Sequence, residues 1–232
     1  CVSISLKNFR WRETKDILSS GLWVSVNKSG ASLLTTVNTY LISIIVSAYM
    51  TGIYSTVTQF VSFVGMMTMA LISCMVPVIY KLYADGKQKE LYFYISKSMK
   101  FLSVFLGMTV GGLIVYERFL LTLMINRIYM EQSLLILLTL LEIPLAYPAN
   151  VTEQVLIAHN KFTVPAMSQL IIGILNIAVI FVVYKIRGAS IYTIVIAGCF
   201  LSVIRNLIFL PIYNQYISGY KKKEHYRQIA AG

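Results

Sequence analysis

Long segments with few charged side chains divide this chain into stretches that can each cross a lipid bilayer. A helix needs about 20 predominantly apolar residues to span a hydrocarbon core of about 30 Å. With 57% hydrophobic and 12% charged residues, the composition lies outside the range of soluble domains. The sequence therefore predicts an all-α membrane protein, a bundle of six transmembrane helices. The six expected spans are 16–48, 54–78, 93–116, 133–156, 162–184 and 191–213.

The charges in the connecting segments give these spans an orientation. An even number of spans places both termini on one side, and fourteen of the twenty Lys and Arg residues fall on that side, against four on the other. Because positive charge is retained in the cytoplasm, we expect both termini to be cytoplasmic and the protein to be a multi-pass protein of the bacterial inner membrane. The expected organisation is a basic cytoplasmic lead (1–15), a six-helix transmembrane lobe (16–216) and a basic cytoplasmic tail (217–232). Residues 117–132 are too short a segment to span, and we expect them to lie in the interface.

The residue types that support catalysis or metal binding are sparse and scattered. The two histidines, His159 and His225, lie in connecting segments with no nucleophile or metal-like cluster beside them. Three cysteines are too few and too far apart for a disulfide framework or a metal site. We therefore expect no enzyme activity, catalytic residue, metal or cofactor. The net charge of +11 indicates attraction to anionic lipid headgroups and, in this context, no nucleic-acid partner. A chain that starts at Cys1 is expected to be processed or truncated.

Polar residues recur on one face of the first expected span. Lys28, Ser32, Thr35 and Asn38 follow one another at steps of three and four, which places them on one side of a helix. Gln59 belongs to a similar series in the second span. The hydroxyls alone leave two interpretations open, because Ser and Thr can bond back to carbonyls of their own helix. Lys28 and Asn38 favour a polar cavity or a packed bundle interior.

Three ionisable side chains stand out within the spans. A charge near the bilayer centre costs on the order of 2.5–3.5 kcal/mol on insertion scales. Lys28 and Arg205 can either snorkel to the cytoplasmic headgroups or face a polar cavity, and both alternatives stay open. Glu142 is expected to be buried, either as an ion-coupling residue or paired with Arg205. Pro144 and Pro148 predict a kink in the same span.

Short motifs spread along nearly the whole chain resemble those of one transporter family. By order and spacing, the chain resembles the C-terminal half of Wzx-type polysaccharide-biosynthesis flippases of the multidrug/oligosaccharidyl-lipid/polysaccharide exporter superfamily. The motifs that carry this resemblance are Asp16-Ile-Leu-Ser-Ser-Gly21, Gly52-Ile-Tyr54, Met75-Val-Pro77, Ala84-Asp-Gly86, Leu156-Ile-Ala-His-Asn-Lys161, Leu175-Asn-Ile177 and Arg187-Gly-Ala-Ser190.

The resemblance implies one lobe of a two-lobed, MATE-like transporter that moves undecaprenyl-diphosphate-linked oligosaccharide repeat units to the outer leaflet by alternating access. It implies that cationic residues of a central cavity attract the diphosphate, and Lys28 and Arg205 are the candidates. Arg205 can fork two donors onto phosphate oxygens, whereas Lys28 acts as a point charge. Further along the path, sugars would be solvated by the polar side chains of Ser32, Thr35, Asn38 and Gln59.

The resemblance also implies partners and leaves rivals. We expect an N-terminal lobe or a second copy to be needed, and a coupling cation, H⁺ or Na⁺, is a further candidate partner. One alternative is a cation-coupled drug or metabolite antiporter of the same superfamily, for which Glu142 is the candidate ion-coupling residue. A less favoured alternative is a membrane-embedded glycan polymerase or acyltransferase, which the short connecting segments disfavour.

Overall fold

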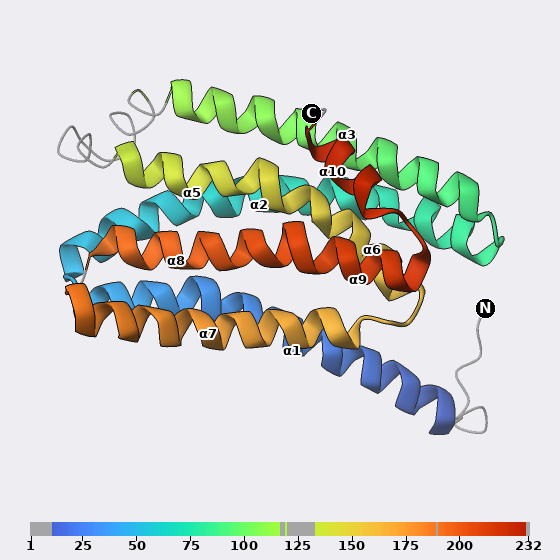
Figure 1. The fold of residues 1–232 in the computed structure, drawn as a ribbon, viewed down its shortest axis with the longest axis horizontal. Helices are drawn as coiled ribbons and strands as arrows, with labels where there is room; N and C mark the ends of the chain where they lie inside the picture. The colour runs from blue at the N-terminus through green and yellow to red at the C-terminus, as the bar shows by residue number, and fades with distance from the viewer. Residues whose placement is uncertain (1–10, 117–118, 120–132, 189, 231–232) are drawn as a thin grey trace, which may run out of the picture.

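The computed structural model describes residues 11–116, 119, 133–188 and 190–230, and this part of the chain is helical with no strand (Figure 1). The first ten residues of the basic lead and most of the segment expected at the interface lie outside it. The helices are α1 (Trp11–Ile45), α2 (Ala48–Ala84), α3 (Gln88–Val115), α5 (Ser133–Ala146), the 3₁₀ turn η3 (Tyr147–Ala149), α6 (Asn150–Ala158), α7 (Thr163–Arg187), α8 (Ile191–Ile204), the π segment η4 (Arg205–Phe209), α9 (Leu210–Ser218) and α10 (Lys222–Ala230).

The long helices run in alternating directions, as short connections between them require. The α2–α3, α6–α7 and α9–α10 connections lie at one end of the bundle, and the α1–α2 and α7–α8 connections lie at the other (Figure 1). The expected Asp-Gly turn follows α2: Gly86 has φ +69°, which glycine adopts without strain. At the other end Ser47 caps α2 by accepting a hydrogen bond from the Met50 amide at 3.2 Å.

Among the described residues, five helical segments are long and apolar enough to cross a membrane: Ala48–Ala84, Gln88–Val115, Leu134–Ala158, Thr163–Ile186 and Ile191–Ser218. The first of the six expected spans coincides with α1, which is not among the five. At 35 residues α1 is about 50 Å long, so length does not exclude it. Its repeated Ser, Thr, Asn and Lys residues lower its hydropathy instead. The chain is therefore an all-helical membrane protein with five candidate spans and one long, more polar helix.

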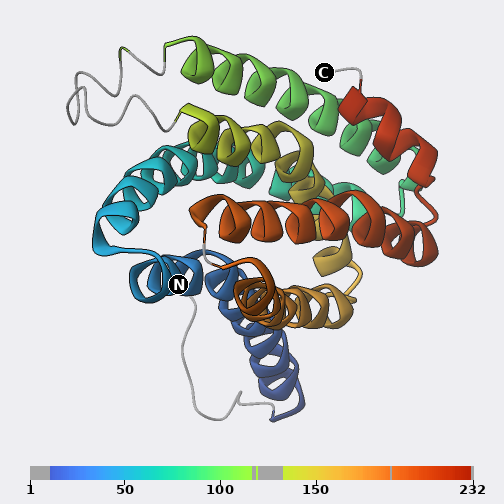
Figure 2. The same ribbon diagram turned by 60° about the vertical axis from the view of Figure 1, so that its left-hand side comes forward.

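Glycines let α1 pack unusually close to α7. A Cβ atom built on Gly30 would lie 2.6 Å from the backbone carbon of Gln169, and one on Gly173 would lie 2.8 Å from the carbonyl oxygen of Gly30. Close crossings of this kind are how small residues strengthen helix pairs in membranes. Helix α7 lies beside the C-terminal part of α1, and the N-terminal end of α1 extends beyond α7 (Figures 1 and 2). The polar helix is thus held against the most hydropathic span.

Prolines shape two of the spans. The kink predicted from Pro144 and Pro148 is confirmed, because the 3₁₀ turn η3 separates α5 from α6 there. A second interruption precedes Pro211, where the π segment η4 joins α8 to α9. Pro77, in contrast, does not end the second span as expected. Helix α2 continues to Ala84, which is consistent with the tolerance of membrane helices for proline.

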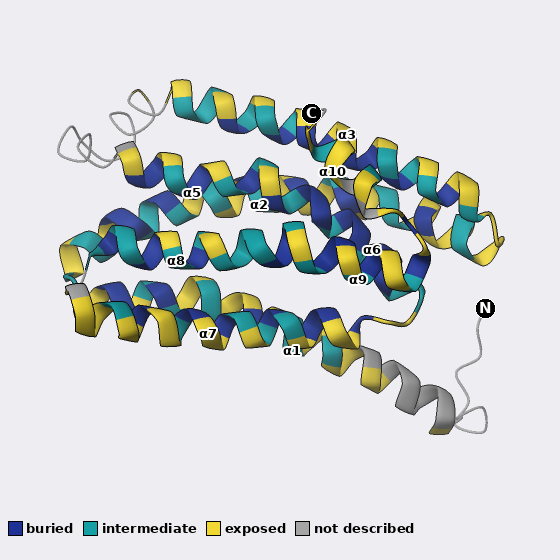
Figure 3. Ribbon diagram, viewed as in Figure 1, coloured by how far each residue is buried: buried dark blue, intermediate teal, exposed yellow. Residues whose placement is uncertain are grey.

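The main core lies between α2, α3, α5 and α8. In the segment Leu134–Ala158 half of the most apolar window is buried, against 22–33% in the other four, so this span is the most enclosed. Exposed positions recur along the outer sides of α3 and α7 (Figure 3), as expected for surfaces that face lipid. The segment expected as a basic tail contains a helix, α10, which packs on α3 and α9.

Candidate functional site

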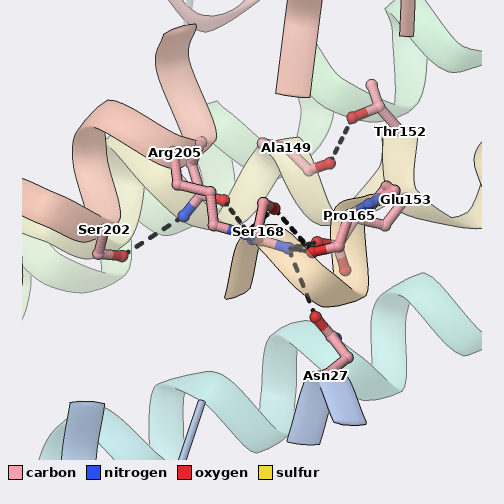
Figure 4. A network of polar contacts seen from close by, with 9 residues as sticks. Asn27, Ala149, Thr152, Glu153, Pro165, Ser168, Ser202 and Arg205 are labelled. Atoms are coloured by element: carbon pink, nitrogen blue, oxygen red, sulfur yellow. Dashed lines mark hydrogen bonds and ion pairs between the residues drawn. The ribbon is translucent and has the colours of Figure 1, made fainter. Parts of the chain in front are cut away.

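Arg205 is the centre of a buried polar network near the α6–α7 end of the bundle (Figure 4). Its side chain is 4% exposed, and its Nη2 atom lies 2.6 Å from Oε1 of Glu153, which is 12% exposed. Nε donates to the Ser168 hydroxyl at 3.3 Å, and Nη1 donates to Oδ1 of Asn206 at 3.0 Å. Nη2 also donates to the carbonyl of Pro165 at 3.3 Å. The guanidinium is therefore satisfied from α6, α7 and η4.

Local backbone chemistry explains why Arg205 begins an irregular turn. Pro211 has no amide hydrogen, so the carbonyl of Leu207 loses its usual helical donor. The chain responds with a π turn in which the Leu210 amide bonds to the Arg205 carbonyl, five residues back. The orphaned Leu207 carbonyl accepts a hydrogen bond of 2.7 Å from the Tyr226 hydroxyl of α10.

The network extends to α1, and it places the two candidate cationic residues, Lys28 and Arg205, at a similar depth along the bundle. Nη2 of Arg205 approaches Oδ1 of Asn27 at 3.5 Å, and Asn27 directly precedes Lys28 (Figure 4). Lys28 itself is exposed, whereas Arg205 is enclosed. The two residues therefore lie near one another in depth but differ in environment. Arg205 does not extend to the headgroups in this structure, and Lys28 has no carboxylate within ion-pair distance in the described part of the chain.

Arg205 is paired with Glu153 and not with Glu142. Glu142 precedes Glu153 by eleven residues, which is about 16 Å along a helix. It lies beside Ser202, whose hydroxyl accepts a 3.4 Å hydrogen bond from Nδ2 of Asn206 at the edge of the Arg205 network. Glu142 also lines a partly open cavity of about 200 Å³, beside Ser202 and Cys199.

This cavity gathers polar side chains from α1, α5, α7 and α8. Thr35, Asn38, Glu142 and Gln169 are among its lining residues. Asn38 is 2% exposed, and its Oδ1 accepts a 2.7 Å hydrogen bond from Nδ2 of Asn176 on α7. The cavity thus offers amide, hydroxyl and carboxylate oxygens in an apolar surrounding. This donor set suits a proton or a small hard cation.

The remaining predicted site residues lie on exposed faces. Ser32 and Thr35 of α1 are exposed, as is Gln59 of α2. Thr35 donates to the carbonyl of Ala31 at 3.3 Å, and Ser32 donates to the hydroxyl of Thr36 at 3.2 Å. The interpretation that the hydroxyls bond within their own helix is therefore confirmed for Thr35. These intrahelical bonds leave acceptor lone pairs free on the same exposed face.

Two residues of the Arg205 network, Glu153 and Ser168, were not predicted as site residues from the sequence. Glu153 falls within the fourth expected span, near its end at 156, and the crossing of α6, α7 and η4 pairs it with Arg205. Within the described part of the chain, no three His, Cys, Asp or Glu side chains come together as a metal site would require.

Comparisons with known proteins place the chain among membrane proteins. It is similar to the uncharacterized membrane protein EpsK of Bacillus subtilis (strain 168), with 24% identity over 233 residues. The alignment covers 95% of this chain and 44% of EpsK, so the chain spans less than half the length of this relative. No family model matches the chain, and no solved structure matches it.

Proposed function

We propose that the chain forms one six-helix lobe of a two-lobed, MATE-like transporter in the bacterial inner membrane, with both termini cytoplasmic. The transporter would flip undecaprenyl-diphosphate-linked oligosaccharide repeat units for cell-surface polysaccharide biosynthesis. In this proposal α1 is the sixth membrane-crossing helix. One side of α1 packs on α7, and the polar side chains on its other side face a polar path instead of lipid.

The observation that carries the proposal is the exposed polar face of α1. Ser25, Lys28, Ser32 and Thr35 are all exposed on a helix that packs along the membrane-spanning α7. A lysine and a row of hydroxyls facing lipid would be unfavourable, since polar groups in hydrocarbon lack water to bond with. A second lobe that encloses a water-filled path on this side would solvate them. The alignment covers only 44% of EpsK, and this supports the proposal that a further segment of chain forms the second lobe.

Lys28 is the proposed contact for the diphosphate. It is exposed on the polar face and has no carboxylate partner among the residues that the structure describes, so its charge is available to an anion. Arg205 is occupied in this conformation, because Glu153, Ser168 and Asn206 take its donors. Direct contact between Arg205 and phosphate therefore requires Glu153 to be displaced. We propose that Arg205 positions α1 through Asn27 and contacts substrate only after such a change.

A second candidate function is a cation-coupled antiporter of drugs or metabolites, and the polar cavity that Glu142 lines favours it. Glu142 is the carboxylate among the cavity residues, next to Asn38 and Thr139. Binding of H⁺ or Na⁺ there would also suit a flippase that uses an ion gradient. The two functions differ in their dependence on Glu142 and Lys28. A flippase loses activity with either residue changed, whereas an antiporter of cationic drugs gains nothing from Lys28.

Water accessibility of single cysteines in a cysteine-free background tests the proposal. Cysteines at Ser25, Ser29 and Ser32 should react with an impermeant charged thiol reagent in intact membranes. A cysteine at Ile174, an exposed apolar position of α7, is the matched control and should stay unreactive because it faces lipid. Equal reactivity at all four positions, or none at the serines, would remove the support for a polar path along α1.

A further inference from the structure

A basic pocket lies between α3 and the tail helix α10, away from the polar face of α1. Its volume is about 680 Å³, within the usual range for ligand sites. Helix α3 contributes Lys97 and Lys100, the turn before α10 contributes Lys221, and α10 contributes Glu224 and Arg227. Figure 1 shows α10 lying against α3 at the end of the bundle where α9 finishes.

Hydrogen bonds between distant segments fix the walls of this pocket. The Tyr92 hydroxyl of α3 donates to the carbonyl of Ser218, and Ser96 and Tyr220 share a hydrogen bond of 2.9 Å. Gly219, with φ +78°, makes the turn that brings these groups together. Burial raises the pKa of the Tyr220 hydroxyl, so this group stays uncharged in the wall. These contacts between α3 and the α9–α10 connection hold the pocket walls in place.

The charges in the pocket are unbalanced. Glu224 is engaged by Arg227, with 2.7 Å between carboxylate oxygen and guanidinium nitrogen. Lys97, Lys100 and Lys221 have no carboxylate within ion-pair distance in the part of the chain that the structure describes. Lys97 instead lies 5.4 Å from the centroid of the Phe93 ring. Three lysine side chains that have no carboxylate partner in the described part of the chain therefore line the pocket, and its one lining carboxylate, Glu224, is engaged by Arg227.

The pocket lies at the level of lipid headgroups. No charged residue occurs in α3 after Lys100, so this lysine marks the point where the helix enters hydrocarbon. Phe93 and Tyr92 lie about two turns earlier, as aromatic residues do at membrane interfaces. A ligand that reaches this site from the bilayer can keep its acyl chains in hydrocarbon while its headgroup enters the pocket.

We propose that this pocket binds the phosphate headgroup of an anionic phospholipid and so ties α10 to the membrane surface. Lysine ammonium groups bind phosphate as point charges, and the exposed Phe93 ring suits the upper part of the acyl chains. An acidic peptide would leave that aromatic surface uncovered, so lipid is the favoured occupant. The inference does not rest on the proposed transport function.

Native mass spectrometry of the purified protein in neutral detergent tests the site. The protein is titrated with dioctanoyl phosphatidylglycerol, with dioctanoyl phosphatidylcholine and with glycerol phosphate. We expect one saturable phosphatidylglycerol and weaker binding of the other two. The variant Lys97→Gln, Lys100→Gln, Lys221→Gln should lose about a hundredfold in affinity for phosphatidylglycerol, since each of the three lysines near an anionic headgroup contributes about fivefold. The corresponding triple arginine variant should retain binding.

The matched control is Lys81→Gln, Lys87→Gln, Lys89→Gln, which removes the same charge at the same end of the bundle outside the pocket. It should lose less than about threefold, because long-range attraction is screened. An equal loss in both triple variants would overturn the proposal in favour of diffuse attraction. Glycerol phosphate binding as tightly as phosphatidylglycerol would also overturn it, because the site would then take free phosphate.

Discussion

The buried pair between Arg205 and Glu153 makes an asymmetric prediction about stability. In Glu153→Leu the guanidinium stays buried and cannot lose its proton, so the variant should be destabilised by about 3–5 kcal/mol. Arg205→Met leaves a carboxylate that is 12% exposed and can take up a proton, so it should cost less, about 1–3 kcal/mol. With both changes the desolvated charges are gone, and the double variant should lie within about 1 kcal/mol of the parent.

The free energy of unfolding of the four proteins, measured by denaturant titration in mixed micelles, gives this double-mutant cycle. The exposed pair Lys87–Glu90, with 3.5 Å between its charged atoms and side chains 51% and 60% exposed, is the control. Its removal by Glu90→Gln should cost less than about 0.5 kcal/mol. Additive effects in the cycle, with the double variant as unstable as the sum of the single ones, would refute the reasoning that Arg205 and Glu153 act as one desolvated pair.

Three further perturbations test the packing and the orientation. Gly30→Ala places a Cβ 2.6 Å from the backbone of Gln169, and it should destabilise the protein by about 1–3 kcal/mol. Gly52→Ala meets open space and should not destabilise the protein. Thermal unfolding measures both effects. Tyr226→Phe leaves a π-segment carbonyl without its 2.7 Å donor and should cost about 1 kcal/mol in the same assay. For topology, a cysteine replacing Lys87 should react only from the cytoplasm and one replacing Lys185 only from outside, and the reverse pattern would contradict the orientation.

Much of the fold follows from the sequence because helix boundaries follow hydrophobic length and turn residues. The kink at Pro144 and Pro148 was predictable, since proline removes a specific helical hydrogen bond. The turn at Gly86 was predictable for the same kind of local reason. What could not be derived locally is where helices touch. The sequence places Gly30 inside an expected span and Gly52 between two of them, but it does not predict that Gly30 lies against the backbone of α7 while Gly52 meets open space.

The candidate site was predictable in its residue types more than in its pairings. Lys28, Asn38 and Arg205 were identified because polar groups within apolar helices need partners. The partners themselves depend on helix crossings: Asn38 bonds Asn176 from a distant helix, and Arg205 bonds Glu153. Periodicity places a residue on a face, but it does not say which other helix that face meets.

The initial rate of flipping in proteoliposomes tests the central proposal most directly. The complete transporter, reconstituted with an undecaprenyl-diphosphate-linked oligosaccharide, should move this lipid between leaflets. Lys28→Gln should slow the movement by roughly tenfold or more, because the variant loses one charge-assisted contact of about 1.5–3 kcal/mol. Lys28→Arg should restore most of the rate, and Lys185→Gln, an exposed lysine at the opposite end, should not change it. A Lys28→Gln protein that flips as fast as the parent would contradict the proposed polar path along α1.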